Sequence, residues 1–129
     1  MADATYPDDL RYHDQHDWAR IEGEEAVFGI TWYAQDSLGE VVFYDAPEVG
    51  STVQKDSSYA AVESVKAVSD VIAPLSGEIV AVNDSLEDAP EKINEDPYGE
   101  GWLIRVKLSS PEESETLLGA AEYRKLLDS

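Results

Sequence analysis

Short runs of apolar and β-branched residues, separated by polar turns, dominate the middle of the chain. Five such runs predict strands, at residues 18–21, 25–30, 41–44, 78–82 and 101–108. The Glu22-Gly23-Glu24 turn lies between the first two and predicts that they form a β-hairpin. The last run alternates well enough to be a half-buried strand. The pattern indicates a mainly β fold.

A short helix and a weak repeat add to this picture. Thr31 can cap a helix that runs to Leu38, with Gly39 at the position where helices commonly end. The four residues 39–42, Gly-Glu-Val-Val, recur at 77–80 as Gly-Glu-Ile-Val. Two similar β units that bury each other's apolar faces would form a pseudo-two-fold sandwich or flattened barrel.

The C-terminal part predicts a second helix. Ser110 and Glu113 have the spacing of a capping box, and Pro111 is a favoured first helical residue. A helix is therefore expected over residues 111–127. Its packing face should consist of Leu117, Leu118, Ala121 and Leu126.

The segment 60–71 gives conflicting signals. Its four valines, at 62, 65, 68 and 71, recur every three residues, and this spacing alone favours a helix. Four valines and two serines in so short a stretch instead favour strands and a turn, and Pro74 ends any helix soon afterwards. Local rules leave both structures open.

Length and composition bound the class of protein. A chain of 129 residues fits one domain, with a core expected at about 12–108 followed by the C-terminal helix. Nine Lys and Arg against 28 Asp and Glu give a net charge of −19, which repels nucleic acids and anionic membrane surfaces. No cysteine is present, so a disulfide framework and a thiolate nucleophile are excluded. Without a leader-like or membrane-spanning apolar run, the cytoplasm is the expected location.

Candidate catalytic and metal-binding groups are weak. His13 and His16 lack a further His or Cys partner, so they make a poor metal site and are expected on a polar surface turn. Residues 94–105 begin like a calcium loop but carry Tyr98 and Arg105 at positions that should hold ligands. We expect neither a metal site nor a catalytic constellation.

One of the five lysines differs from the others. Lys66 lies between Val65 and Ala67 in a small, apolar setting. From residue chemistry alone, a surface lysine paired with Glu63 or Asp70 is the favoured interpretation.

The string VESVKAVSD at 62–70 closely resembles the lipoyl-attachment motif of the glycine cleavage system H protein family. The resemblance covers almost the whole chain. It includes His-Asp-Trp at 16–18, the blocks at 29–31, 33–35 and 38–43, Pro-Leu-Ser-Gly-Glu at 74–78, and Asn-Glu-Asp-Pro-Tyr-Gly-Glu-Gly-Trp at 94–102.

This resemblance implies a carrier protein that is not an enzyme. Members of the family hold lipoate in amide linkage on the motif lysine, here Lys66, where a lipoate ligase or lipoyl transferase attaches it. A pyridoxal-phosphate glycine decarboxylase then loads an aminomethyl group onto the lipoyl arm. An aminomethyltransferase passes the carbon to tetrahydrofolate, and dihydrolipoyl dehydrogenase reoxidises the dithiol. A monomer is expected.

The resemblance also implies a structure and a set of site residues. The fold would be a lipoyl- and biotinyl-carrier-like hybrid of sandwich and barrel, with Lys66 at the tip of a tight hairpin. Residues expected to be recognised by the lipoylating enzyme are Glu63, Ser64, Val65 and Ala67. Asp17 and Asp70 match the family's carboxylates in the cleft where the loaded arm docks. Asp17 replaces the usual Glu and is one methylene shorter.

Other classes of protein have distinct sequence features. A biotin carrier places its lysine between methionines, but Met1 is the sole methionine here. A lipoyl domain of a 2-oxoacid dehydrogenase usually has Asp where this chain has Val65. A carrier that relays lipoyl groups to other lipoate-dependent enzymes would look nearly identical. An acidic decoy or chaperone-like binding module would need no modified lysine.

Overall fold

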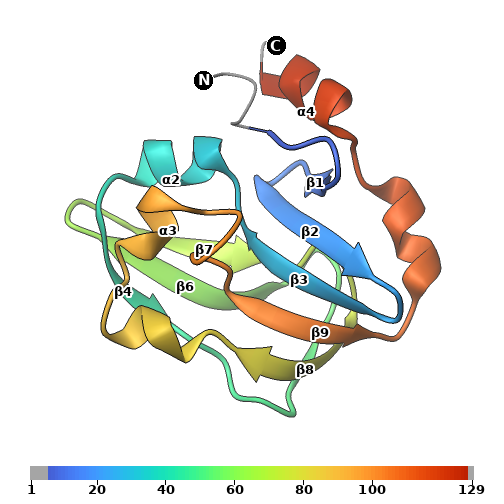
Figure 1. Cartoon of the computed structure of the whole chain (residues 1–129), viewed down its shortest axis with the longest axis horizontal. Coiled ribbons are helices and arrows are strands. Elements are labelled where there is room, and N and C mark those ends of the chain that lie inside the picture. Colours follow the sequence, from blue (N-terminus) through green and yellow to red (C-terminus); the bar gives the residue numbers. More distant parts are fainter. Residues whose placement is uncertain (1–5, 128–129) are drawn as a thin grey trace.

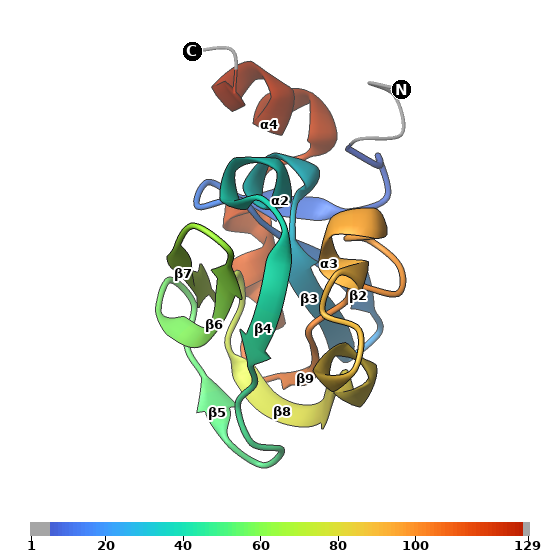
Figure 2. The same cartoon turned by 90° about the vertical axis from the view of Figure 1, so that its left-hand side faces the viewer.

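Two antiparallel sheets form the body of the protein. The computed structural model describes residues 6–127 (Figure 1). The larger sheet has the strand order β1 (Arg11–His13), β2 (Asp17–Glu22), β3 (Glu25–Ile30), β9 (Ile104–Leu108), β8 (Gly77–Val82) and β5 (Thr52–Val53). The smaller sheet has the order β4 (Val41–Asp45), β6 (Ser58–Ser64) and β7 (Val68–Ile72). The two sheets face each other as an unclosed, barrel-like sandwich, which Figure 2 shows from the side of β4.

Short helices connect the strands. They are α2 (Trp32–Leu38), η1 (Asp84–Glu87), α3 (Lys92–Glu95), η2 (Pro111–Thr116) and α4 (Ala120–Leu127), where η marks 3₁₀ helices. In the described part of the chain, no helix is long and apolar enough to cross a membrane.

The core lies between the two sheets. Buried side chains come from both layers and include Phe28, Ile79 and Val106 of the larger sheet and Val62 and Val71 of the smaller. Strand β9 shows the alternation expected when one face of a sheet is covered, because Ile104, Val106 and Leu108 are buried and Lys107 is exposed. The mainly β sandwich expected from the sequence is confirmed.

Most of the predicted strands occupy their expected places. The turn at Gly23, which has φ +66°, joins β2 to β3 as a hairpin. The two repeats open β4 and β8, one in each sheet. The predicted strand at 101–108 is shorter than expected and begins at Ile104.

The short helix α2 is confirmed together with its capping residues. The Thr31 hydroxyl accepts a hydrogen bond from the Ala34 backbone N–H at 3.3 Å. Gly39 ends the helix with φ +88°, a conformation that residues with a side chain disfavour.

The predicted C-terminal helix is confirmed, but it does not run continuously over 111–127. The segment divides into η2 and α4, with a non-helical stretch between them. Leu118 pairs with Tyr12 through two backbone hydrogen bonds of 2.8 Å, so its backbone belongs to a β-bridge. A residue paired in this way cannot also continue a helical hydrogen-bond ladder.

The predicted cap and packing face are also corrected. Ser110 makes no side-chain cap hydrogen bond. The Glu113 carboxylate instead accepts hydrogen bonds from the Ser76 backbone N–H at 2.8 Å and hydroxyl at 3.0 Å. The expected packing residues differ in burial, with Leu117 buried, Leu118 half-buried, and Ala121 and Leu126 exposed.

Helix α4 packs through different residues from those expected. Ala120 and Tyr123 are its buried residues. Tyr123 stacks on Tyr12 with ring centroids 4.8 Å apart, in a second apolar cluster that also contains Trp18. Through this cluster α4 packs against β1 (Figure 1).

Candidate functional site

The segment 60–71 is a β-hairpin, and Lys66 lies in its tight turn. Strand β6 ends at Ser64 and β7 begins at Val68. The Ser64 hydroxyl oxygen accepts hydrogen bonds from the backbone N–H groups of Lys66 at 3.2 Å and Ala67 at 3.1 Å. The Ser64 N–H donates to the Ala67 carbonyl at 2.8 Å. One buried serine therefore fixes the turn, because it satisfies donors that the strand ladder leaves unpaired.

The turn projects from the body of the protein (Figure 1). Lys66 is exposed, and its apolar neighbours Val65 and Val68 are 71% and 66% exposed. Within residues 6–127, no ion pair joins Lys66 to Glu63 or Asp70, so the paired surface lysine is not observed. The Lys66 side chain is therefore accessible to solvent at the tip.

The hairpin leans against the connection between α2 and β4. The Val65 N–H donates to the Glu40 carbonyl at 3.2 Å. Gly39 lies beside the lysine side chain, because a Cβ placed on it would be 3.4 Å from Lys66 Cε. In the sequence Gly39 and Glu40 mark a helix end and a repeat, and they belong to the block 38–43 of the family resemblance. Nothing local indicates that they lie beside the lysine turn.

A row of side chains crosses the smaller sheet next to the turn. The strand register pairs Phe43 with Glu63 and Glu63 with Val68, which puts the three side chains on the same face. Phe43 is 50% exposed. The surface around Lys66 therefore combines apolar side chains with a half-buried carboxylate.

Asp70 is a residue of β7, and Asp17 at the start of β2 accepts a hydrogen bond from β7, but the two carboxyl groups have different environments. Asp17 is 1% exposed, and burial raises the pKa of its carboxyl well above 3.8, although a backbone hydrogen bond from Ile72 opposes the shift. Its Oδ2 atom has no hydrogen-bond partner in the described part of the protein. Asp70 is exposed, two residues before Ile72 on the same strand.

A buried phenol accompanies Asp17. The Tyr59 hydroxyl lacks a hydrogen-bond partner among the described residues. Burial raises the pKa of Tyr59 well above 10.0, and the charges of Tyr44 and Asp17 raise it further. Nothing in the sequence singles out Tyr59, because an isolated tyrosine in a strand carries no local signal of this neighbour.

The expectation that the two histidines lie on a polar surface turn is wrong for His13. Its side chain is buried, with Nε2 2.6 Å from an Asp56 carboxylate oxygen, and this hydrogen bond lowers the pKa of Asp56. His16 is half-buried with Nδ1 2.7 Å from the Tyr123 hydroxyl, and burial lowers its pKa. No cluster of metal-ligating side chains is found in residues 6–127.

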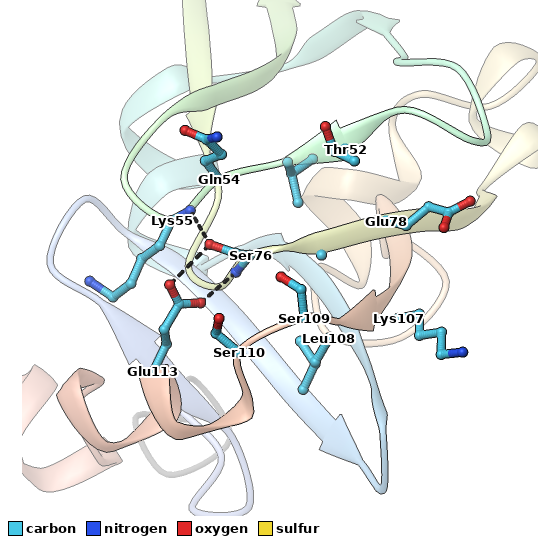
Figure 3. Close-up of a pocket in the computed structure, with 12 residues that line it drawn as sticks. Thr52, Gln54, Lys55, Ser76, Glu78, Lys107, Leu108, Ser109, Ser110 and Glu113 are labelled. Atoms are coloured by element: carbon cyan, nitrogen blue, oxygen red, sulfur yellow. Dashed lines mark hydrogen bonds between the residues drawn. The ribbon is translucent and has the colours of Figure 1, made fainter.

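A hollow of about 820 Å³ lies away from the hairpin that carries Lys66, and hydrogen bonds that hold the fold together line it (Figure 3). None of its lining residues belongs to the turn that carries Lys66. The Ser76 hydroxyl, which lines it, accepts from the Lys55 backbone N–H at 2.9 Å and donates to Glu113. These bonds fasten η2 to the start of β8.

Comparisons with known proteins agree with one another. Residues 10–129 match the family described as glycine cleavage H-protein. A glycine cleavage system H protein of Rubrobacter xylanophilus is 56% identical over 125 residues, which is 97% of each chain. One from Symbiobacterium thermophilum is 52% identical over 120 residues, covering 93% of this chain and 94% of the relative. The crystal structure of a glycine cleavage system H protein from Mycobacterium marinum matches with a TM-score of 0.87 at 42% identity, over 95% of this chain and 99% of the other.

Proposed function

Because this chain belongs to the glycine cleavage H-protein family, we propose that it carries lipoate in amide linkage on Lys66. It acts as a single-domain carrier that catalyses no reaction itself. The observation that carries the proposal is the exposed lysine at the tip of a hydrogen-bonded turn. A tethered arm needs an accessible amine on a rigid support, because tethering raises the effective concentration at each partner.

The bound lipoyl group would supply a dithiolane that accepts the aminomethyl group of glycine and releases the carbon to the next enzyme. The chain's own residues present that arm. The exposed Val65 and Ala67 contact the lipoate ligase or lipoyl transferase directly. Ser64 and Glu63, which are less exposed, act through the shape of the turn and the charge beside it.

The partner enzymes that share the arm are glycine decarboxylase, aminomethyltransferase and dihydrolipoyl dehydrogenase. Each must approach the same tip, where Phe43 and Val68 form an apolar surface beside the Glu63 carboxylate. At a net charge of −19, the protein would attract a basic rim on the partner over long range. The protein works as a monomer in the cytoplasm, so that each partner reaches the arm in turn.

Asp17 and Asp70 hold the cationic amine of the transferred group while the arm is loaded. The Oδ2 atom of Asp17 has no hydrogen-bond partner among the described residues, so it can accept a bond from the amine. The Asp17 carboxyl also accepts a hydrogen bond from the Ile72 N–H, and Asp70 lies on the same strand as Ile72. A cation that approaches a buried carboxyl favours its ionised form and makes a charge-assisted hydrogen bond with it.

The decisive experiment replaces Lys66 with arginine, which keeps the positive charge and most of the stem but offers no primary amine. We expect Lys66→Arg to fold normally, to gain no lipoyl mass with lipoate ligase, and to support no glycine decarboxylation. Matched controls are arginine at each remaining lysine, namely Lys55, Lys92, Lys107 and Lys125. A Lys66→Arg protein that still gains one lipoyl group would overturn the assignment. A lipoylated wild type that fails with glycine decarboxylase but donates lipoyl groups to other enzymes would indicate the relay function instead.

A further inference from the structure

The sequence block at 94–102 has no role in the proposed function, but its first residue binds the segment that lies beside the lysine-bearing hairpin. Asn94, in α3, uses both ends of its side-chain amide. Oδ1 accepts a hydrogen bond from the Val41 N–H at 2.8 Å. Nδ2 donates to the Gly39 carbonyl at 2.8 Å and to Gln35 Oε1 at 3.0 Å. The two backbone groups fix the orientation of the amide, because an N–H only donates and a carbonyl only accepts.

These bonds hold both ends of the short segment that lies beside the lysine. Glu40 lies between Gly39 and Val41, so its peptide orientation follows from theirs. Its carbonyl accepts from the Val65 N–H at 3.2 Å. Among the hydrogen bonds of the turn residues 65–67 within the described part of the protein, this one alone leaves the hairpin.

We propose that Asn94 is a positioning residue for Lys66, acting through the Gly39–Val41 segment to hold the turn in the orientation that the lipoylating enzyme recognises. The inference rests on the proposed function, in which Lys66 is the lipoylated residue. The role requires a side chain that donates and accepts at once. An amide does so across the working pH range, whereas a carboxylate of the same shape only accepts.

The test is Asn94→Asp, which preserves the shape and the bond from Val41. The Gln35 amide can turn round to donate to the introduced carboxylate, but the backbone carbonyl of Gly39 cannot. A carboxylate oxygen then faces the Gly39 carbonyl oxygen, and two acceptors cannot form a hydrogen bond with each other. With unlipoylated protein and purified lipoate ligase, we expect kcat/KM for lipoylation to fall about tenfold, the effect of losing one strong hydrogen bond.

A second readout follows the hairpin without any cofactor. Amide hydrogen exchange at Val65 should accelerate in Asn94→Asp, while the Lys66 and Ala67 amides, held by Ser64, should change less. The Val65 amide resonance should also return towards its wild-type position as the pH falls, because protonation gives the introduced carboxyl a donor again.

Asn83→Asp is the matched control. The Asn83 amide also bridges backbone groups, since Nδ2 donates to the Glu100 and Trp102 carbonyls at 2.8 Å each. Its Oδ1 accepts from the Ser85 hydroxyl at 2.6 Å and N–H at 3.3 Å. This variant should lose stability without a selective change at Val65 or a matching fall in the lipoylation rate.

The outcomes separate the two levels of the proposal. Wild-type lipoylation kinetics or wild-type Val65 exchange in Asn94→Asp overturns the positioning role, as does an equal loss in Asn83→Asp. If Asn94→Asp fails to fold, Asn94→Ala removes the bond to Gly39 without adding charge, although it removes the bonds with Val41 and Gln35 as well, and it is judged by the same two readouts. A wild-type protein that gains lipoate at a residue other than Lys66 refutes the proposed function itself.

Discussion

Replacing Asp17 with asparagine should change how the stability of the protein depends on pH. Burial raises the pKa of this carboxyl in the folded protein above the usual value of 3.8, which the unfolded chain keeps. Below that pH both states hold the proton. Above it the unfolded chain releases a proton that the folded protein keeps, so the free energy of unfolding falls by about 1.4 kcal/mol per pH unit. The loss stops once the pH passes the folded-state pKa.

The assay is urea unfolding of wild type and Asp17→Asn at a series of pH values. The side chain of the variant binds no proton. The free energy of unfolding of the variant minus that of wild type should therefore rise by about 1.4 kcal/mol per pH unit and then level off. Tyr59 and Tyr123 interact with the Asp17 charge, but burial raises the pKa of each phenol above 10.0, so both stay neutral in this range. Asp70→Asn, which removes an exposed carboxylate, is the matched control. A difference curve that is flat, or that matches the control, would refute the reasoning.

Two further predictions concern the loaded arm and the charge of the whole protein. The double variant Asp17→Asn, Asp70→Asn should fold and be lipoylated but release aminomethyl groups faster from the isolated loaded protein, measured without the transferase. An unchanged release rate, or the same acceleration in the surface variant Asp84→Asn, means that these carboxylates are not the clamp. At a net charge of −19, the melting temperature should rise by several degrees from dilute buffer to molar KCl. The reason is that the Debye length falls to about 3 Å at 1 M salt, which screens the repulsion between the carboxylates. A flat or falling melting temperature would contradict this prediction.

The sequence predicts the structure well where local chemistry decides it. The hairpin at Gly23 and the helix after Thr31 each depend on a turn or capping residue that acts within a few positions. The valine spacing at 60–71 misleads for a physical reason. Val62 and Val71 are buried in the core, whereas Val65 and Val68 are exposed around the turn. Regular spacing therefore combines two environments, and only the hairpin register separates them.

Long-range contacts explain what local patterns miss. The capping-box pattern correctly marks Glu113 as a hydrogen-bond acceptor. Its carboxylate, however, accepts from the Ser76 backbone N–H and hydroxyl and not from the start of the helix. Leu118 is taken out of the helix by pairing with Tyr12, more than a hundred positions earlier. The position of Asn94 beside the Gly39–Val41 segment is equally non-local, and no spacing rule indicates it.

The turn that carries Lys66 has to be exposed and yet keep a single orientation. An exposed tip buries little apolar surface, so packing cannot order it. A single orientation must then come from hydrogen bonds whose acceptors are anchored elsewhere. Ser64 supplies one anchor from the buried end of β6, and the Glu40 carbonyl supplies another from the end of α2. Substitutions of residues that bind backbone atoms near the turn should therefore disorder the turn more than substitutions of the exposed residues that flank Lys66.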